Sequence, residues 1–198
     1  MLHFFESNDY IQFLAIIPHH NTLSDLERIQ QMAHHYPLYP LITPLCSLED
    51  NSCNSTPIDT TQLRKFIKEQ QKTLTHCSLC IKAPELRQKD SNIKKIICPI
   101  QGLPTFKSDY LTEKRVPEPF TKNAFTLTYE TPVSEQNSHS LQESILMHKK
   151  ASLTMRVYRI GIVTVKKIPN EQSNKDLRLE NILGFSWTVS HDVWVKSK

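Results

Sequence analysis

Short hydrophobic runs alternate with polar, proline-containing segments through the first half of the chain. An uninterrupted hydrophobic run before Pro18 predicts a buried strand, and hydrophobic side chains spaced three and four apart behind Ser24 predict a helix. The capping-box spacing from Ser24 to Glu27 places the start of that helix at Ser24, and Pro37 ends it. Pro44 indicates an edge strand or a bulge. The predicted elements are strands over 11–17 and 40–48, helices over 24–36 and 61–74, and strands over 77–83 and 93–100 around a polar turn at 88–91.

The second half is richer in strand-forming residues. Threonine and aromatic side chains alternate in one segment, and two long β-branched runs separated by a charged loop predict a closing hairpin. The predicted elements are a loop over 101–122, a strand over 124–131, a helix over 140–150, and strands over 153–165 and 182–195. The strand–helix–strand unit recurs in both halves. This predicts an α+β protein, a single bilobal domain over 1–198 with two antiparallel sheets around a central cleft and helices packed outside.

The composition permits a core and excludes several enzyme classes. Of the 198 residues, 38% are hydrophobic, which is enough for a chain of this length to fold without metal or disulfide support. The three glycines, Gly102, Gly161 and Gly184, are too far apart for GxGxxG, GxxxxGK[ST] or GxSxG. These motifs need glycine where the backbone approaches a phosphate or turns sharply. Dinucleotide-binding, P-loop and α/β-hydrolase enzymes are therefore excluded.

The charge distribution and the cysteines indicate which kinds of partner the protein could bind and in which cell compartment it would be found. The net charge of +4 comes from the second half, which is compatible with a phosphate-bearing partner such as RNA or a nucleotide. No hydrophobic run has the length of a membrane span, and the first ten residues do not fit a signal peptide, so no membrane partner is predicted. The five cysteines are irregularly spaced, which favours an intracellular protein, cytoplasmic or nuclear. Cys77 and Cys80 would face opposite ways in a strand, so neither a metal site nor a cofactor is predicted.

Two predicted strand segments carry a family resemblance. The segments are YPLITP over 39–44 and NAFTLTY over 123–129, and Leu41 and Ala124 within them are 83 residues apart. With the order of elements, this interval resembles the 2H phosphoesterase superfamily, which includes LigT-like and cyclic phosphodiesterase-like proteins. In that family each of two such strands carries His-x-Thr/Ser. Here Leu41 and Ala124 stand where the two histidines belong.

The resemblance implies a phosphate-binding cleft without its acid–base pair. In the family one histidine acts as general base and the other as general acid, and each proton transfer contributes roughly 10²–10⁴-fold. Leu41 and Ala124 cannot transfer a proton, whereas Thr43 and Thr126, two residues further along each strand, still donate hydrogen bonds. This implies a protein without catalytic residues that binds RNA or a phosphorylated ligand, or that acts as a scaffold in a protein assembly. The predicted substrate-binding residues are Tyr39, Thr43, Thr126 and Tyr129.

Other interpretations of these residues stay open. Thr43 and Thr126 also suit ordinary strand positions, because threonine is common in strands. An active 2′,3′-cyclic phosphodiesterase or RNA end-processing hydrolase would have to recruit His20, His76, Tyr39 or Tyr129. The segments beginning at His20 and His76 do match His-x-Thr/Ser, but with a shorter interval between them. A pure interaction module would use the loop over 101–122.

Overall fold

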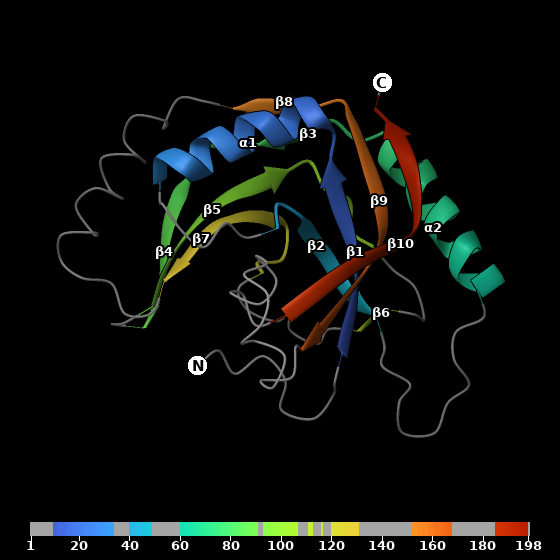
Figure 1. Ribbon diagram of the computed structural model, residues 1–198. Coiled ribbons are helices and arrows are strands. Elements are labelled where there is room, and N and C mark those ends of the chain that lie inside the picture. Colours follow the sequence, from blue (N-terminus) through green and yellow to red (C-terminus); the bar gives the residue numbers. More distant parts are fainter. Residues whose placement is uncertain are drawn as a thin grey trace.

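Two antiparallel sheets and two helices make up the described part of the chain, so the fold is α+β (Figure 1). The computed structural model describes residues 10–33, 40–48, 60–90, 93–106, 111–112, 116, 120–130, 152–167 and 185–197. The elements are β1 (Tyr10–Pro18), α1 (His20–Ala33), β2 (Thr43–Leu48), α2 (Thr60–Thr75), β3 (Leu79–Ile81), β4 (Glu85–Asp90), β5 (Ile93–Gln101), β6 (Leu111–Thr112), β7 (Ala124–Glu130), β8 (Leu153–Met155), β9 (Val157–Lys167) and β10 (Phe185–Lys196).

The first sheet has the strand order β10-β9-β1-β2-β6. Its central strand β1 is the predicted hydrophobic run, and side chains on both of its faces are buried, as its lack of alternation indicated. The predicted hairpin of two long closing strands is confirmed by the pairing of β9 with β10. The predicted irregularity at Pro44 is also confirmed, because the pairing of β1 with β2 shifts register between Leu14 and Ala15, and Ala15 lies opposite Pro44.

The second sheet has the strand order β4-β5-β3-β8, and β7 pairs with the other side of β5. The predicted strand over 124–131 is confirmed as β7. The predicted turn at 88–91 is wrong, because Gln88 and Asp90 belong to β4 and pair with β5. Polar side chains are compatible with a strand here, since β4 is at the edge of the sheet, where one side of the strand needs no partner.

One predicted strand contributes to both sheets. The hydrophobic run over 153–165 is interrupted at Arg156, so that β8 pairs with β3 in the second sheet and β9 pairs with β1 in the first. The carbonyl of Arg156 accepts a hydrogen bond from the backbone N–H of Ser197 (N···O 2.9 Å), which supports the chain at this break. The prediction of one continuous strand is therefore wrong, because hydrophobicity does not mark where a chain changes sheets.

The helices cover different sheets (Figure 1). Helix α1 lies over the second sheet, where the buried Gln30 Nε2 donates to the carbonyl of Leu127 in β7 (2.8 Å). Helix α2 packs against β9 and β10, and the Tyr158 hydroxyl in β9 donates to the carbonyl of Leu74 (3.4 Å). Helix α1 follows β1 of the first sheet and packs against β7 of the second, so it joins the two sheets, whereas α2 packs against strands of the first sheet.

The start of α1 differs from the prediction. The helix begins at His20, and the backbone N–H of Leu23 donates to the carbonyl of His19 (2.8 Å), which makes His19 the N-terminal capping residue. Ser24 therefore lies inside the helix, and its capping-box spacing with Glu27 has no capping role. Helix α2 confirms the second predicted helix, with Phe66, Ile67, Gln70 and Leu74 buried. The predicted helix over 140–150 lies outside the described residues.

Two hydrophobic clusters hold the elements together. The main core joins both sheets and both helices through buried side chains that include Ile16, Leu26, Ile67 and Phe125. A smaller core lies on the other face of β1 and consists of Phe13, Ala15, Ile17, Ile42, Phe120, Val163 and Val165. Because buried residues of both sheets share the main core, burial of one sheet's hydrophobic face depends on the other.

Candidate functional site

The strands that carry the two motif-like segments meet at Asn123. This residue has a left-handed backbone (φ 61°), which asparagine adopts more readily than most residues. Its N–H donates to the carbonyl of Pro44 in β2 (2.8 Å), and its carbonyl accepts from the N–H of Ile100 in β5 (2.9 Å). Asn123 immediately precedes β7. The first and second sheets are therefore hydrogen-bonded to each other where the resemblance places the centre of the site.

The two predicted hydroxyls are both buried but face different surroundings. Thr43 is 0% exposed and lies opposite Ile16, a main-core residue, and its hydroxyl is buried without a hydrogen-bond partner. Thr126 is 1% exposed and lies between Phe125 and Leu127, which both belong to the main core. Because successive side chains on a strand alternate, Thr126 points away from that core.

A hydrogen bond accounts for the position of the second hydroxyl. Thr126 Oγ1 donates to Thr121 Oγ1 (3.2 Å), on the segment that leads into β7. Neither Thr43 nor Thr126 is among the lining residues of the two pockets described below. The role of the two hydroxyls in phosphate binding stays a prediction.

The other residues singled out by the resemblance are placed as follows. Leu41 is nearly buried, just before β2, and lines a pocket. Ala124 is the buried first residue of β7. Tyr39 lies outside the described residues, and Tyr129 is in β7 but its side chain lies outside the described part. Of the residues that the resemblance singled out, Leu41 is the one that lines this pocket among the described residues.

The alternative histidines do not occupy strands. His20 is the exposed first residue of α1, with its ring 3.8 Å from that of His19 between centroids, and His76 is exposed just after α2. A His-x-Thr/Ser pattern on a strand presents both side chains to one face, which a helix start or a helix end does not do. Neither histidine is among the lining residues of the two pockets described below.

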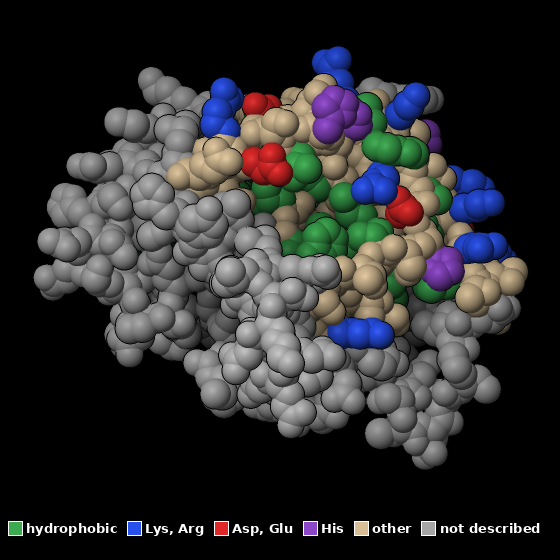
Figure 2. Space-filling view, viewed as in Figure 1, with side chains coloured by type: hydrophobic (Ala, Val, Ile, Leu, Met, Phe, Trp, Pro, Cys, Tyr) green, Lys and Arg blue, Asp and Glu red, His purple; other side chains and the backbone are tan. Residues whose placement is uncertain are grey.

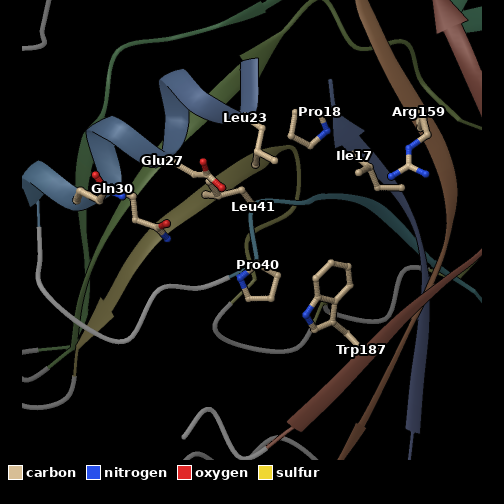
Figure 3. Close-up of a pocket in the computed structure, with 10 residues that line it drawn as sticks. Ile17, Pro18, Leu23, Glu27, Gln30, Pro40, Leu41, Arg159 and Trp187 are labelled. Carbon is tan, nitrogen blue, oxygen red and sulfur yellow. The ribbon is translucent and has the colours of Figure 1, made fainter. Parts of the chain in front are cut away.

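A pocket of about 520 Å³, here called the Leu41 pocket, opens between α1, the end of β1, the segment just before β2, and strands β9 and β10. Figure 3 shows Glu27 and Leu23 of α1 and Leu41 on one side, Arg159 on the other, and Trp187 with Pro40 below. Figure 2 shows this face as a hydrophobic hollow with charged side chains around it. The described residues that line the pocket are Ile17, Pro18, Leu23, Glu27, Gln30, Gln31, Pro40, Leu41, Arg159 and Trp187.

Arg159 is the cation of this pocket and is held in place by two neighbours. Its Nη1 lies 2.8 Å from Asp192 Oδ2, and its guanidinium lies 5.6 Å from the ring centroid of Trp194. An arginine has five N–H donors, so the contact with Asp192 leaves donors for a ligand. The ring of His19 also meets Trp194 edge-on at 5.8 Å between centroids. Arg159 is therefore a positioned donor at the edge of the pocket.

Burial makes the deep thiols unreactive. It raises the pKa of Cys46 and of Cys98 from 9.0 to about 12, and the burial of Tyr158 raises the pKa of its hydroxyl above the usual value. A thiol at such a pKa carries almost no thiolate at neutral pH and is a poor nucleophile. Cys77 precedes β3 and Cys80 lies within it, and both are free and partly exposed.

The remaining pocket residues were not predicted from the sequence. Trp187 and Arg159 were assigned only to closing strands, and Gln30 and Glu27 only to a helix. They become neighbours because β9, β10 and α1 are brought together by sheet pairing and by the shared core. A tryptophan and an arginine on neighbouring strands can be recognised as parts of one binding site only when the pairing register of those strands is known.

Comparison with known proteins adds no assignment, because no protein-family model and no curated protein matches the chain. No helix in the described part of the chain combines the length and hydrophobicity needed to cross a membrane.

Proposed function

We propose that the protein binds a nucleotide, free or at the end of an RNA chain, in the Leu41 pocket and does not cleave it. The observation that carries the proposal is the joint presence of an aromatic ring, an arginine and a hydrophobic wall in one pocket of about 520 Å³. Pockets of this size, mostly hydrophobic with a few placed polar groups, are typical of small-molecule sites.

The chemistry of the lining matches the two ends of a nucleotide. A base stacks on an aromatic side chain whatever its identity, and Trp187 offers such a ring beside Pro40. Arg159 offers planar N–H donors to a phosphate, with which arginine pairs well. Glu27 repels a phosphate and accepts hydrogen bonds from sugar hydroxyls. Its place across the pocket from Arg159 orients the phosphate toward β9 (Figure 3).

The same lining argues against cleavage. Phosphodiester hydrolysis through two proton transfers needs one group that accepts a proton and another that donates one. Among the described residues lining the pocket there is one carboxylate, Glu27, and no histidine, and the arginine stays protonated, so a pair of proton-transfer groups is missing. Leu41 occupies the position where the resemblance expects a histidine. An active cyclic phosphodiesterase is therefore the less favoured alternative.

The proposal includes descent of this protein from the 2H phosphoesterases that it resembles. Two antiparallel sheets hydrogen-bonded between Pro44 and Asn123 support a bilobal arrangement related to that family. Thr43 and Thr126 are buried away from the Leu41 pocket, so the proposed binding relies on Trp187 and Arg159 and does not need the two hydroxyls.

The test is the affinity of a nucleoside 5′-monophosphate and of a short RNA, measured by calorimetry. Trp187→Ala removes the stacking surface, which is worth roughly 1–3 kcal/mol per base, so affinity should fall by roughly 5- to 150-fold. Trp194→Phe is the control, because Trp194 does not line the pocket and phenylalanine keeps an aromatic ring beside Arg159. In that control Trp187 is the remaining tryptophan, and its fluorescence should change as the ligand binds.

The salt dependence gives a second readout. The logarithm of RNA affinity should fall against the logarithm of salt concentration by roughly 0.7 for each phosphate contacted, and Arg159→Gln should reduce that slope. Equal losses of affinity in Trp187→Ala and Trp194→Phe, or no binding at low salt, would overturn the proposal.

A further inference from the structure

A second pocket lies between α2 and β10, on the side of the first sheet away from β2. Its volume is about 370 Å³, and the described residues that line it are Arg64, Lys68, His191, Asp192 and Val193. We propose that this α2–β10 pocket is an anion site that takes a phosphate group. The inference does not rest on the proposed function, because the two pockets share no lining residue, although the ion pair between Arg159 and Asp192 links their edges.

Two cations face this pocket from one helix. Arg64 and Lys68 are four residues apart in α2, so their side chains lie one above the other on the same side of the helix. Neither forms an ion pair with another residue in the described part of the chain. Like charges at this spacing repel each other. An anion bound between them relieves the repulsion.

A bulge in β10 supplies the opposite wall. The pairing of β9 with β10 passes from Ser190 opposite Ile162 to Val193 opposite Ile160, so His191 and Asp192 are both set against Gly161. His191 has a left-handed backbone (φ 54°), a strained conformation for a residue with a side chain. Bulges redirect side chains at the edges of sheets, and this one places His191 at the pocket beside α2.

The bulge packs closely against Gly161, where a side chain would not fit. A Cβ added there would lie 2.8 Å from the Cβ of Asp192, closer than two such carbons can approach. The absent side chain lets Asp192 reach Arg159 of the neighbouring strand (2.8 Å). The carboxylate of Asp192 also lines the α2–β10 pocket and repels an anion. Its pairing with Arg159 offsets that repulsion, which leaves Arg64 and Lys68 as the pocket's unpaired charges among the described residues.

His191 provides the observation that points most directly to a ligand. Its Nδ1 atom is buried and has no hydrogen-bond partner. A buried polar atom without a partner is costly, and its presence in a native structure calls for an explanation. Because this atom is closed off from solvent, the ring has to turn toward the pocket before Nδ1–H can donate to a phosphate oxygen held by Arg64 and Lys68. Figure 2 agrees with a local excess of positive charge, since Lys and Arg side chains gather at the right-hand margin, where Figure 1 places α2.

The experiment titrates the full chain with inorganic phosphate at low salt and constant pH, followed by amide NMR and calorimetry. Signals from α2 and from 190–193 should shift. Arg64→Gln with Lys68→Gln should weaken phosphate binding about tenfold or more, because each removes a charged hydrogen-bond donor. The matched control is Lys65→Gln with Lys72→Gln, which removes the same charge from exposed positions of α2 outside the pocket and should change affinity less than about twofold.

Two further variants separate the site from general attraction and from folding. His191→Gly removes the ring at a position where glycine tolerates the backbone conformation, and should weaken phosphate binding without loss of the folded state in thermal unfolding. Trp187→Ala, which should weaken nucleotide binding in the Leu41 pocket, should leave phosphate binding in the α2–β10 pocket unchanged. Failure of one proposal can therefore be told apart from failure of the other.

Competition distinguishes the source of the phosphate group. A short RNA with a 5′-terminal phosphate should displace inorganic phosphate if the site takes an RNA end, while the dephosphorylated RNA should not. Displacement by a nucleoside monophosphate alone indicates a small ligand. The inference is overturned if phosphate does not bind at low salt, or if the control pair of substitutions weakens binding as much as Arg64→Gln with Lys68→Gln.

Discussion

Replacing Thr43 by valine is expected to stabilise the protein. The hydroxyl of Thr43 is 0% exposed and has no hydrogen-bond partner, whereas valine presents a methyl group of nearly the same shape to the surrounding core. Burying a hydroxyl without a partner costs about 1–3 kcal/mol on the scale of protein mutations. Allowing for local relaxation, we expect the free energy of unfolding to rise by about 1 kcal/mol, which raises Tm by roughly 2–4 °C for a domain of this size.

Thr126→Val is the matched variant and should have the opposite sign. It removes the hydrogen bond between Thr126 Oγ1 and Thr121 Oγ1 (3.2 Å) in a buried setting, so the free energy of unfolding should fall by about 1 kcal/mol. Both variants are compared with the wild type by urea denaturation, provided that unfolding is two-state and the slope m is unchanged. A clear loss of stability in Thr43→Val would refute the reasoning, because it would show that the hydroxyl has a partner in solution.

Two further predictions follow from the packing. Gly161→Ala should lower the free energy of unfolding by about 1–3 kcal/mol, because the new Cβ meets the Cβ of Asp192 at 2.8 Å, and urea denaturation should show the loss shrinking when Asp192→Gly is added. Additive losses would contradict this contact. Burial raises the pKa of Cys46 and Cys98 from 9.0 to about 12, so the folded state holds both protons after the unfolded chain releases them, and stability should decline between pH 9 and 12. Unfolding measured across that interval should show this decline, and a pH-independent stability would be evidence against buried thiols.

The spacing of hydrophobic residues predicted those strands and helices in which one regular set of side chains is buried. The continuous run of β1, the alternation of β7 and the helical stripe of α2 were predicted from spacing alone, because each buries a face that its own residues define. The polar strand β4 was missed, since pairing with β5 and an edge position decide its conformation. The break at Arg156 was missed because a change of sheet leaves no mark on hydrophobicity.

The candidate sites were less predictable than the fold. Leu41 was found from its position in a motif-like segment, but Trp187 and Arg159 enter the same pocket only through the pairing of β9 and β10. His191 had no sequence signal at all, because a bulge opposite Gly161 decides where its ring points. Contacts between residues far apart in the chain depend on register, which periodicity does not specify.

The central claim is binding without cleavage, and one measurement tests both parts. A 2′,3′-cyclic nucleotide is incubated with the protein and followed by phosphorus NMR over many hours. The account predicts that the signal of the cyclic phosphate shifts or broadens as protein is added, that this effect is lost in Trp187→Ala, and that no phosphomonoester signal grows above the protein-free background. A phosphomonoester signal that grows with the wild type and disappears with Trp187→Ala would contradict the claim, as would a spectrum that the protein leaves unchanged.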